Sequence, residues 1–369
     1  MAALHGLLLA AILFFSGKLN ATSNKFLSLS LFGIFIILFY EGVGYLEIEN
    51  QIPLWFQLLP IYVRSSIPVG IFYFSIFLIQ PKHSLNKFEK IGFLLIAIEI
   101  SIELLHIPAN LIQGNEALMN WANDRIMMVG EYFGLLACLI LFPLSLQRVN
   151  RYQKYLYGHY STTKDKSLGW LRTFIILCMG ISLIWLISLV QYVLGFEEAS
   201  GFTYLILTLG LIGSMFWIGY FIILYHNWFQ IVPLPEKVDQ LGKGANKLSQ
   251  KTDTYHKSLI ELMQQDKLYE DIDLTLENLA QSLQISSGYL SQIINEKEQK
   301  NFFEFVNLYR VESVKEKLLN PEFEHYTIMG IALESGFKSK STFNSVFKKF
   351  TGQTPSTFKR QSKQKVLIP

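Results

Sequence analysis

Apolar residues follow two different patterns along the chain. Before Val232 they form long, nearly continuous stretches, whereas after Asp273 they recur every three or four residues, the spacing of helices with one buried face. The long stretches number seven: roughly Ala2–Ser16, Phe26–Tyr45, Leu54–Ile79, Ile91–Ile107, Ile126–Leu146, Leu171–Leu194 and Phe202–Phe229. Most approach the ~20 residues that a membrane-spanning helix needs. The pattern predicts an all-α fold, in which a seven-helix transmembrane bundle precedes a smaller helical domain.

The composition supports a membrane region, and the sequence contains no recognisable catalytic motif. Hydrophobic residues make up 51% of the 369 residues, which is too apolar for one soluble domain. The two cysteines, Cys138 and Cys178, lie inside apolar stretches, so we expect buried side chains instead of a disulfide or a metal site. The sequence contains no metalloprotease or serine-hydrolase motif. It therefore predicts a protein that is not an enzyme and that has no cofactor and no bound metal.

The polar connections between the apolar stretches differ in charge. Alternate connections place eleven positive residues on one side: Lys18, Lys25, Lys82, Lys87, Lys90, Arg148, Arg151, Lys154, Lys164, Lys166 and Arg172. The other side has one, Arg125, together with six acidic residues. Since Lys and Arg favour the cytoplasmic side, we expect the N-terminus outside and the region after Phe229 in the cytoplasm. The first stretch has no Lys or Arg before Lys18, which favours a spanning helix over a signal peptide.

The region after Asp273 contains a repeated helical pattern. In the first copy, apolar residues from Leu276 share one helix face, and a break at Gln284–Ile285 separates them from a second apolar helix. The second copy starts at Ile328 and breaks at Gly336–Phe337. Hydroxyl residues that can cap the four helices precede them: Thr275, Ser286, Thr327 and Ser339. These features predict two helix-turn-helix units, joined by a helix at Asn301–Asn320 that has one apolar stripe.

Several motifs in this region resemble a known family. They are Leu274-Thr-Leu-Glu-Asn-Leu-Ala280, Gly336-Phe337, Phe343-x-x-x-Phe347-Lys-Lys, Gly352 and Thr354-Pro355. Their order and spacing are similar to those of the AraC/XylS family of bacterial transcription regulators. The resemblance covers about a third of the chain and implies sequence-specific binding to double-stranded DNA. We therefore expect a transmembrane sensor region at 1–230, a cytoplasmic linker at 231–254 and an AraC-type DNA-binding domain at 255–369.

The second helix of each unit is the expected DNA reader, because in a helix-turn-helix this helix enters the major groove. With its apolar residues turned inward, the predicted base-reading residues are Ser287, Gly288, Ser291, Gln292, Lys340, Ser341, Asn344 and Ser345. Lys348 and Lys349 are predicted to contact phosphates, within a run from Lys338 to Lys365 that holds eight Lys or Arg and no acid. Family members often have Arg at the positions of Gln292 and Ser345, so their base preference does not carry over.

Ionisable residues inside the apolar stretches are costly in a membrane and are usually paired or functional. Seven of them lie in the outer half of the predicted bundle or at its rim: His5, Glu41, Arg64, Glu99, Glu103, His106 and Glu131. Glu99, Glu103 and His106 share one helix face, and the candidate ligand site comprises Arg64, Glu99, Glu103, His106 and Glu131. One hypothesis is a polar cavity, open to the outside, that binds a small ligand, either a cationic molecule or a metal ion, because carboxylates outnumber the arginine. The alternative is that Arg64 neutralises a glutamate and locks the bundle while the other charges reach the interface.

Together these patterns predict a one-component regulator in the bacterial inner membrane, whose cytoplasmic domain binds specific DNA in response to a signal sensed at the membrane. Its expected partners are double-stranded DNA, the lipid bilayer and an unknown small ligand. Paired DNA sites would favour a homodimer, although no heptad repeat requires one. Two other protein classes stay open: a transporter with a regulatory tail, for which we see no half-to-half repeat, and a seven-helix receptor whose tail binds a protein.

Overall fold

The computed structural model describes residues 2–15, 21–45, 63–105, 116–163, 166–224 and 252–366. Over these ranges the fold is helical and contains no strand, and Tyr160 and Thr275 form one isolated antiparallel bridge. The chain separates into two compact units. The N-terminal unit comprises Met1–Arg151 and Leu168–Leu234, and the C-terminal unit comprises Tyr152–Ser167 and Pro235–Pro369. The predicted all-α class is confirmed for the described residues.

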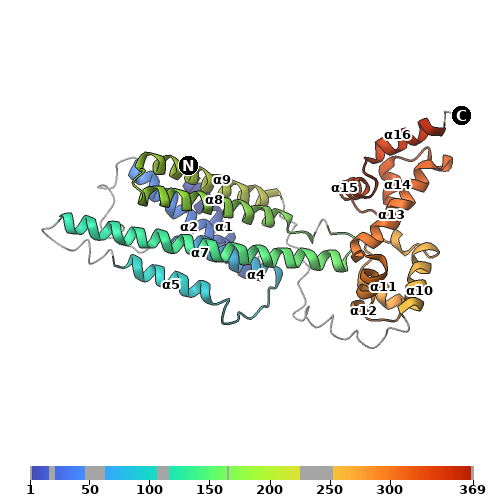
Figure 1. Cartoon of the computed structure of the whole chain (residues 1–369), viewed down its shortest axis with the longest axis horizontal. Coiled ribbons are helices and arrows are strands. Elements are labelled where there is room, and N and C mark those ends of the chain that lie inside the picture. Colours follow the sequence, from blue (N-terminus) through green and yellow to red (C-terminus); the bar gives the residue numbers. More distant parts are fainter. Residues whose placement is uncertain are drawn as a thin grey trace. The chain divides into compact units, whose positions relative to one another are not determined.

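In the N-terminal unit, a helix lies at each of the seven predicted apolar stretches (Figure 1). These helices are α1 Ala2–Phe15, α2 Ala21–Tyr45, α4 Ser66–Ile79, α5 Ile91–Glu103, α7 Glu116–His159, α8 Gly169–Val193 and α9 Glu197–Leu224. The end of α7, from Tyr152, belongs to the C-terminal unit. Among the described residues, four segments are long and apolar enough to cross a membrane: Thr22–Val43, Ile126–His159, Gly169–Val193 and Gly201–Phe221. The others are shorter, so the number of seven spans stays a prediction.

Helices α2 and α4 pack closely because small residues face each other. A Cβ added to Gly70 of α4 would overlap the hydroxyl of Ser30 on α2, and one added to Gly33 of α2 would overlap the hydroxyl of Ser66 on α4. Ser30 Oγ donates a hydrogen bond of 2.8 Å to the carbonyl oxygen of Ile67. Small residues and hydroxyl bonds between helices are typical of helix association in a membrane.

The C-terminal unit contains the two predicted helix-turn-helix units. Its helices are α10 Thr252–Gln264, α11 Leu276–Ser282, α12 Ser287–Ile293, α13 Phe302–Leu319, α14 Ile328–Glu334, α15 Lys340–Thr351 and α16 Pro355–Val366. Each of the four predicted caps accepts a hydrogen bond from a backbone N–H in the first turn of its helix: Thr275, Ser286, Thr327 and Ser339. Local capping therefore starts α11, α12, α14 and α15 at the predicted positions.

Helix α13 lies between two hydrophobic cores. Phe302, Phe305 and Val306 pack into one core with residues of α10, α11 and α12. Phe303 and Val311 belong to a second core, which contains residues of α14 and α15. The sequence predicted one apolar stripe on this helix, and the structure adds a second one. The reason is that a helix joining two cores must be apolar on two faces.

Candidate functional site

The first recognition helix, α12, buries its apolar residues and turns its polar ones outward. Leu290 and Ile293 are fully buried. The predicted base-reading residues of this helix are all partly exposed: Ser287, Gly288, Ser291 and Gln292. Gln292 Nε2 donates a hydrogen bond of 2.7 Å to Glu296 Oε1, in a π-helical turn, Ile294–Glu298, that extends α12. A base that pairs with the Gln292 amide must therefore replace a carboxylate partner.

The second recognition helix, α15, has a more open polar face. Its predicted base-reading residues are all exposed: Lys340, Ser341, Asn344 and Ser345. Ser345 Oγ donates to the Thr342 carbonyl oxygen of its own helix at 2.9 Å. Phe343 and Phe347 are buried on the opposite face. The structure thus presents a row of hydrogen-bonding side chains along one side of α15.

The two predicted phosphate-binding lysines differ in their surroundings. Lys348 is exposed and has no ion-pair partner among the described residues. Lys349 Nζ lies 2.7 Å from Glu304 Oε1 of α13. The hydrogen bond from Lys349 is the main cause that holds the pKa of Glu304 below its ordinary value. Lys348 is therefore the better placed of the two for a phosphate, because Lys349 also ties α15 to α13.

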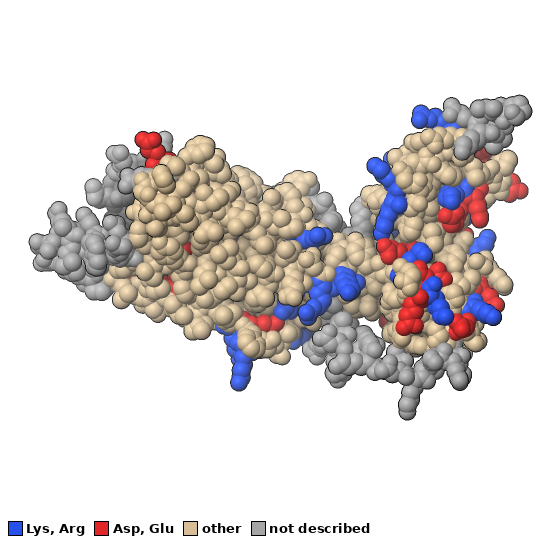
Figure 2. Space-filling view, in the orientation of Figure 1, with Lys and Arg blue, Asp and Glu red and all other residues tan. Residues whose placement is uncertain are grey.

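Charge is distributed unevenly over the two units. Figure 2 shows the described surface of the N-terminal unit as largely uncharged, whereas acidic and basic side chains intermix on the C-terminal unit, over the part that holds α10, α11 and α12 in Figure 1. Helix α15 contains Lys340, Lys348 and Lys349 and no acidic residue. The second helix-turn-helix unit therefore has the stronger attraction for phosphates.

A cluster of charged residues lies inside the N-terminal unit. Arg64 is 2% exposed and pairs with two carboxylates, Glu103 at 3.2 Å from Nη1 and Glu131 at 3.0 Å from Nε. Glu99 accepts the backbone N–H groups of Arg64 and Ser65 at 2.9 and 2.8 Å. The structure thus brings together four of the five residues of the predicted ligand site. The fifth, His106, lies outside the described residues.

Two glycines of α7 make room for the arginine. A Cβ on Gly130 would lie 2.8 Å from Arg64 Nη1, and a Cβ on Gly134 would lie 2.7 Å from Arg64 Cβ. Both distances are shorter than real Cβ contacts, so a larger residue would displace the arginine. These glycines explain how a long cationic side chain fits between closely packed helices.

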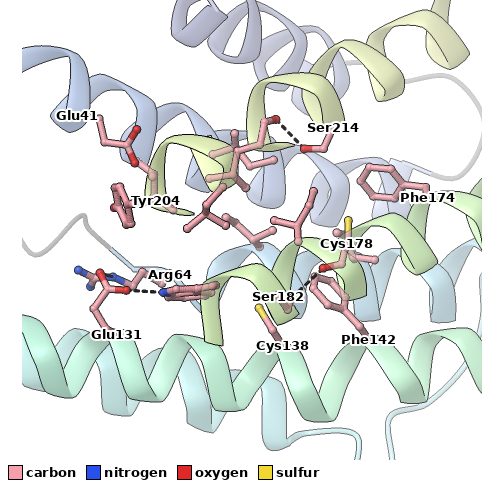
Figure 3. Close-up of a pocket in the computed structure, with 18 residues that line it drawn as sticks. Glu41, Arg64, Glu131, Cys138, Phe142, Phe174, Cys178, Ser182, Tyr204 and Ser214 are labelled. Carbon is pink, nitrogen blue, oxygen red and sulfur yellow. Dashed lines mark hydrogen bonds and ion pairs between the residues drawn. The ribbon is translucent and has the colours of Figure 1, made fainter. Parts of the chain in front are cut away.

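A cavity of about 60 Å³ adjoins this cluster. Figure 3 shows that the charged residues Glu41, Arg64 and Glu131 lie at one end of it with Tyr204, whereas Phe142, Phe174 and two cysteines lie towards the other, together with Ser182. The lining residues come from α2, α7, α8 and α9 and from the start of α4. The cavity therefore combines charged groups at one end with an apolar lining at the other.

Two residues of the polar end, Trp185 and Glu41, lie outside the predicted ligand site, although Glu41 was expected among the ionisable groups of the outer half. Trp185 Nε1 donates a hydrogen bond of 2.7 Å to Glu131 Oε2. Glu41 Oε2 accepts from Thr208 at 2.9 Å, and its other oxygen, Oε1, is buried without a partner among the described residues. Glu41 can be recognised in the sequence because it is the single acidic residue within the apolar stretch Phe26–Tyr45. Nothing in the spacing singles out Trp185.

Comparison with known proteins identifies the C-terminal region. Residues 279–361 match a family described as a helix-turn-helix domain. This part of the chain is 36% identical over 87 residues to an uncharacterised HTH-type transcriptional regulator of Staphylococcus aureus, and 27% identical over 95 residues to the melibiose operon regulatory protein of Escherichia coli. The matches cover 24% and 26% of this chain, but only 11% and 30% of the two relatives.

A solved structure of a protein of unknown function from Listeria innocua is also similar, at 26% identity over 28% of this chain and 94% of that chain, with a TM-score of 0.26. The family match and the regulators agree with the motifs read from the sequence. The C-terminal region therefore contains a helix-turn-helix domain of the AraC type, which is a DNA-binding domain and not a catalytic one.

Proposed function

We propose that the protein is a one-component transcription regulator that is anchored in the bacterial inner membrane and binds specific DNA in response to a signal sensed there. The observation that carries this proposal is the combination, in one chain, of an AraC-type helix-turn-helix domain with four helices of spanning length among the described residues. The positive charge of alternate connections supports a cytoplasmic C-terminal unit, where DNA is accessible.

DNA recognition would use both recognition helices. Each would enter one major-groove segment, with the exposed face of α15 and the outward residues of α12 towards the base edges. Lys340 and Asn344 carry the groups that pair with guanine and adenine, respectively. Lys348 would contact a phosphate. Two copies of the chain on paired sites would form a homodimer, which raises the affinity for such sites.

Signal sensing would take place at the charged cluster and its cavity. Four carboxyl groups lie on or near the cavity, those of Glu41, Glu99, Glu103 and Glu131, and Arg64 is the one guanidinium among the described lining residues. Because a carboxylate excess favours positive charge, the ligand would be a small molecule with a cationic group at the polar end and an apolar part in the cavity.

The DNA-binding part of the proposal is tested with the intact protein in lipid nanodiscs. The protein is mixed with fragmented genomic DNA at ~0.15 M salt, where specific and non-specific binding separate, and the bound fragments are sequenced. We expect enrichment of a short motif, and loss of this enrichment in a Lys340→Ala, Asn344→Ala variant. Recovery of fragments without any common motif would contradict a sequence-specific regulator and favour a protein partner for the C-terminal unit.

The sensing part is tested in cells, with a reporter placed behind the enriched motif. We expect Glu103→Gln to abolish the response of the reporter to growth conditions, because it weakens the ion pair with Arg64, while the protein still inserts in the membrane. Lys87→Gln, in a polar connection, is the control and should respond normally. An unchanged response of the Glu103→Gln variant would contradict the cavity as the sensor.

A further inference from the structure

The connection between α7 and α8 passes through the C-terminal unit. Four residues directly after α7, Tyr160–Thr163, run antiparallel to Ile272–Thr275, the segment that leads into α11. The Ser161 N–H and the Ser161 hydroxyl both donate to the Leu274 carbonyl oxygen, at 3.3 and 2.7 Å, and Thr162 Oγ1 donates to the Ile272 carbonyl oxygen at 3.2 Å. We call Tyr160–Thr163 the strap.

Two buried side chains of α13 hold the strap. Arg310 and Asn307 are both 0% exposed. Arg310 Nη2 donates to Ser161 Oγ at 3.1 Å, and Asn307 Nδ2 donates to the Ser161 carbonyl oxygen at 3.0 Å. Other donors of Arg310 bind the carbonyl oxygens of Tyr269 and Asp271, each at 2.7 Å. Since every N–H of a buried guanidinium needs an acceptor, the strap supplies part of the environment that allows Arg310 to be buried.

The strap is buried like a bound peptide, although it belongs to a connection between helices. Ser161 is 1% exposed and Thr163 is 6% exposed, whereas such connections usually lie on the surface. Next to it, the ring of Tyr157 packs edge-on against Phe303 with centroids 5.1 Å apart, and Lys166 Nζ lies 3.7 Å from the centre of the Tyr160 ring. Polar and aromatic contacts together make the connection an integral part of the domain.

Arg310 lies where the two helix-turn-helix units meet. A Cβ on Gly336, in the turn of the second unit, would lie 2.8 Å from Arg310 Nε and would overlap the Tyr269 carbonyl oxygen. Lys338, two residues later, pairs with Asp273 at 3.2 Å. The segment that the strap touches therefore also touches the second unit. A change in the position of the strap alters the partners of Arg310 at this junction.

The same helix that ends at the strap also contributes to the cavity of the N-terminal unit. Helix α7 spans Glu116–His159 with Pro143 inside it, and Glu131 on this helix lines the cavity. The next residue, Tyr160, is the first of the strap. A shift or rotation of α7 at the cavity can therefore reach the strap along one helix, with Pro143 between the two sites.

We propose that the strap is the coupling element of the protein: docked on Arg310 and Asn307, it fixes the arrangement of the two helix-turn-helix units that binds DNA. This inference rests on the proposed function, because the DNA-binding state is what the strap controls. Undocking of the strap exposes Arg310 and loosens the junction. The two recognition helices then no longer have the spacing that two successive major-groove segments require.

Docking is tested by a disulfide in the intact protein. Bridged residues on antiparallel segments have Cα atoms about 4.5–5.5 Å apart, which suits a disulfide. We expect a Tyr160→Cys, Thr275→Cys variant in nanodiscs to form this bond on mild oxidation, with the linked peptides identified by mass spectrometry. The control pairs Tyr160→Cys with Thr327→Cys, the equivalent cap of the second unit, and should not form it. No bond in the first variant, or equal bonds in both, overturns docking.

The coupling role is tested by measuring affinity for the enriched DNA motif. Ser161→Leu places a larger apolar side chain at a buried position, and we expect it to weaken binding about tenfold or more, within the usual range of coupling between sites. Ser161→Ala, which removes only the hydroxyl, should fold normally and weaken binding by a smaller factor. Ser356→Leu, at an exposed position of α16, is the matched control and should bind like the unmodified protein.

The possible results separate the two proposals. Unchanged motif affinity in both Ser161 variants overturns the coupling role and leaves the proposed function intact. If the unmodified protein enriches no motif, the proposed function fails, and the coupling role fails with it, while the disulfide still decides whether the strap docks. Formation of the Tyr160–Thr275 disulfide, together with graded losses in the Ser161 variants, supports the inference.

Discussion

The two helix-turn-helix units share a plan but differ at their turns. Both begin their helices with hydroxyl caps, and both turns use a residue with positive φ: Gln284 at 55° in the first unit and Gly336 at 88° in the second. Gln284 is exposed, so its side chain extends into solvent. Gly336 lies against Arg310 and the Tyr269 carbonyl oxygen, where no Cβ fits. The same backbone conformation therefore allows a side chain at the turn of the first unit, whereas tertiary contacts require glycine at the turn of the second.

The recognition helices differ in charge as well. Helix α12 spans seven residues and continues into a turn that carries Glu296 and Glu298, whereas α15 spans twelve residues, carries three lysines and has no acid. This difference indicates a division of work, in which the second unit supplies most of the attraction to phosphates. In the proposed complex the first unit would add contacts from Gln292 and its neighbours, with a smaller electrostatic contribution.

Substitution at the turns should give the largest difference between the units. Gly336→Ala is expected to destabilise the C-terminal unit by more than the ~1–3 kcal/mol that unfavourable backbone angles cost, because the new Cβ also overlaps backbone atoms. Gln284→Ala, at an exposed position with the same sign of φ, should change stability by less than ~0.5 kcal/mol. Hydrogen exchange in the intact protein measures the two effects, in α14 and α15 for Gly336→Ala and in α11 and α12 for Gln284→Ala. Equal effects would contradict the comparison.

Base reading should depend more on α15 than on α12. Lys340→Ala is expected to cost ~1–3 kcal/mol in binding to the preferred motif and to relax selection at one base pair. Gln292→Ala should cost less, because its amide already bonds to Glu296 and gains less from a base. Binding titrations on the motif and on single-base variants give both numbers. A larger loss for Gln292→Ala would reverse the assignment.

Loss of one phosphate contact should appear in the salt dependence. We expect Lys348→Ala to weaken binding to all sequences alike and to reduce the slope of log affinity against log salt by ~0.9. Lys297→Ala, at an exposed position next to the acids of the first unit, should leave the slope nearly unchanged. Affinities measured between ~0.05 and ~0.3 M salt decide this.

Removal of one cap should destabilise the two units to a similar degree. Ser286→Ala and Ser339→Ala each delete a hydroxyl that accepts a bond of 3.3 Å from a backbone N–H, and each should cost ~1 kcal/mol. Ser→Asn changes at the same positions should restore most of the loss, since Asn caps as well as Ser. Local hydrogen exchange of α12 and α15 is the measurement, and a clear inequality would show that tertiary contacts hold one helix start.

Low pH should slightly weaken the ion pair between Glu304 of α13 and Lys349 of α15. The pKa of Glu304 is held below its ordinary value of 4.5, mainly by the hydrogen bond from Lys349. A depressed folded-state pKa stabilises the fold above the ordinary value, and this stabilisation is lost as the pH falls through the lower folded-state value. At neutral pH Lys349→Ala should cost at most ~1 kcal/mol, because Lys349 is well exposed. Denaturation at pH 7 and at successively lower pH should show a difference between the two proteins that is largest at pH 7 and shrinks as Glu304 becomes protonated.

Much of the local structure could be predicted from short-range patterns. The seven apolar stretches each contain a helix, the four caps lie where hydroxyl residues precede apolar repeats, and the exposed residues of α15 match those assigned from its inward-facing phenylalanines. Each of these features depends on residues three or four positions apart. The second apolar face of α13 was missed because its residues interleave with the first, so that neither face dominates the periodicity.

The charged cluster shows where pattern reading stops. Because charges are rare in apolar stretches, the sequence identified Arg64, Glu99, Glu103 and Glu131 as unusual. It did not predict which of these residues would form ion pairs. The structure shows two carboxylates on the guanidinium and a third on backbone N–H groups. The ion pairs depend on which helices are neighbours, because a carboxylate on any helix next to Arg64 could have paired with it.

The sequence by itself determined the class of the protein: an apolar region with helices of spanning length, followed by two capped helix-turn-helix units with a basic second half. These properties arise from local hydrogen bonds, turn conformations and the period of the helix, which a short stretch of sequence specifies without contacts from distant segments. Only the tertiary structure decided that Ser161 binds Arg310, 149 residues later, and that Glu41 and Trp185 complete the polar end of the cavity. Such contacts join distant segments whose approach results from the packing of the whole unit, and no repeat or motif marks them in advance.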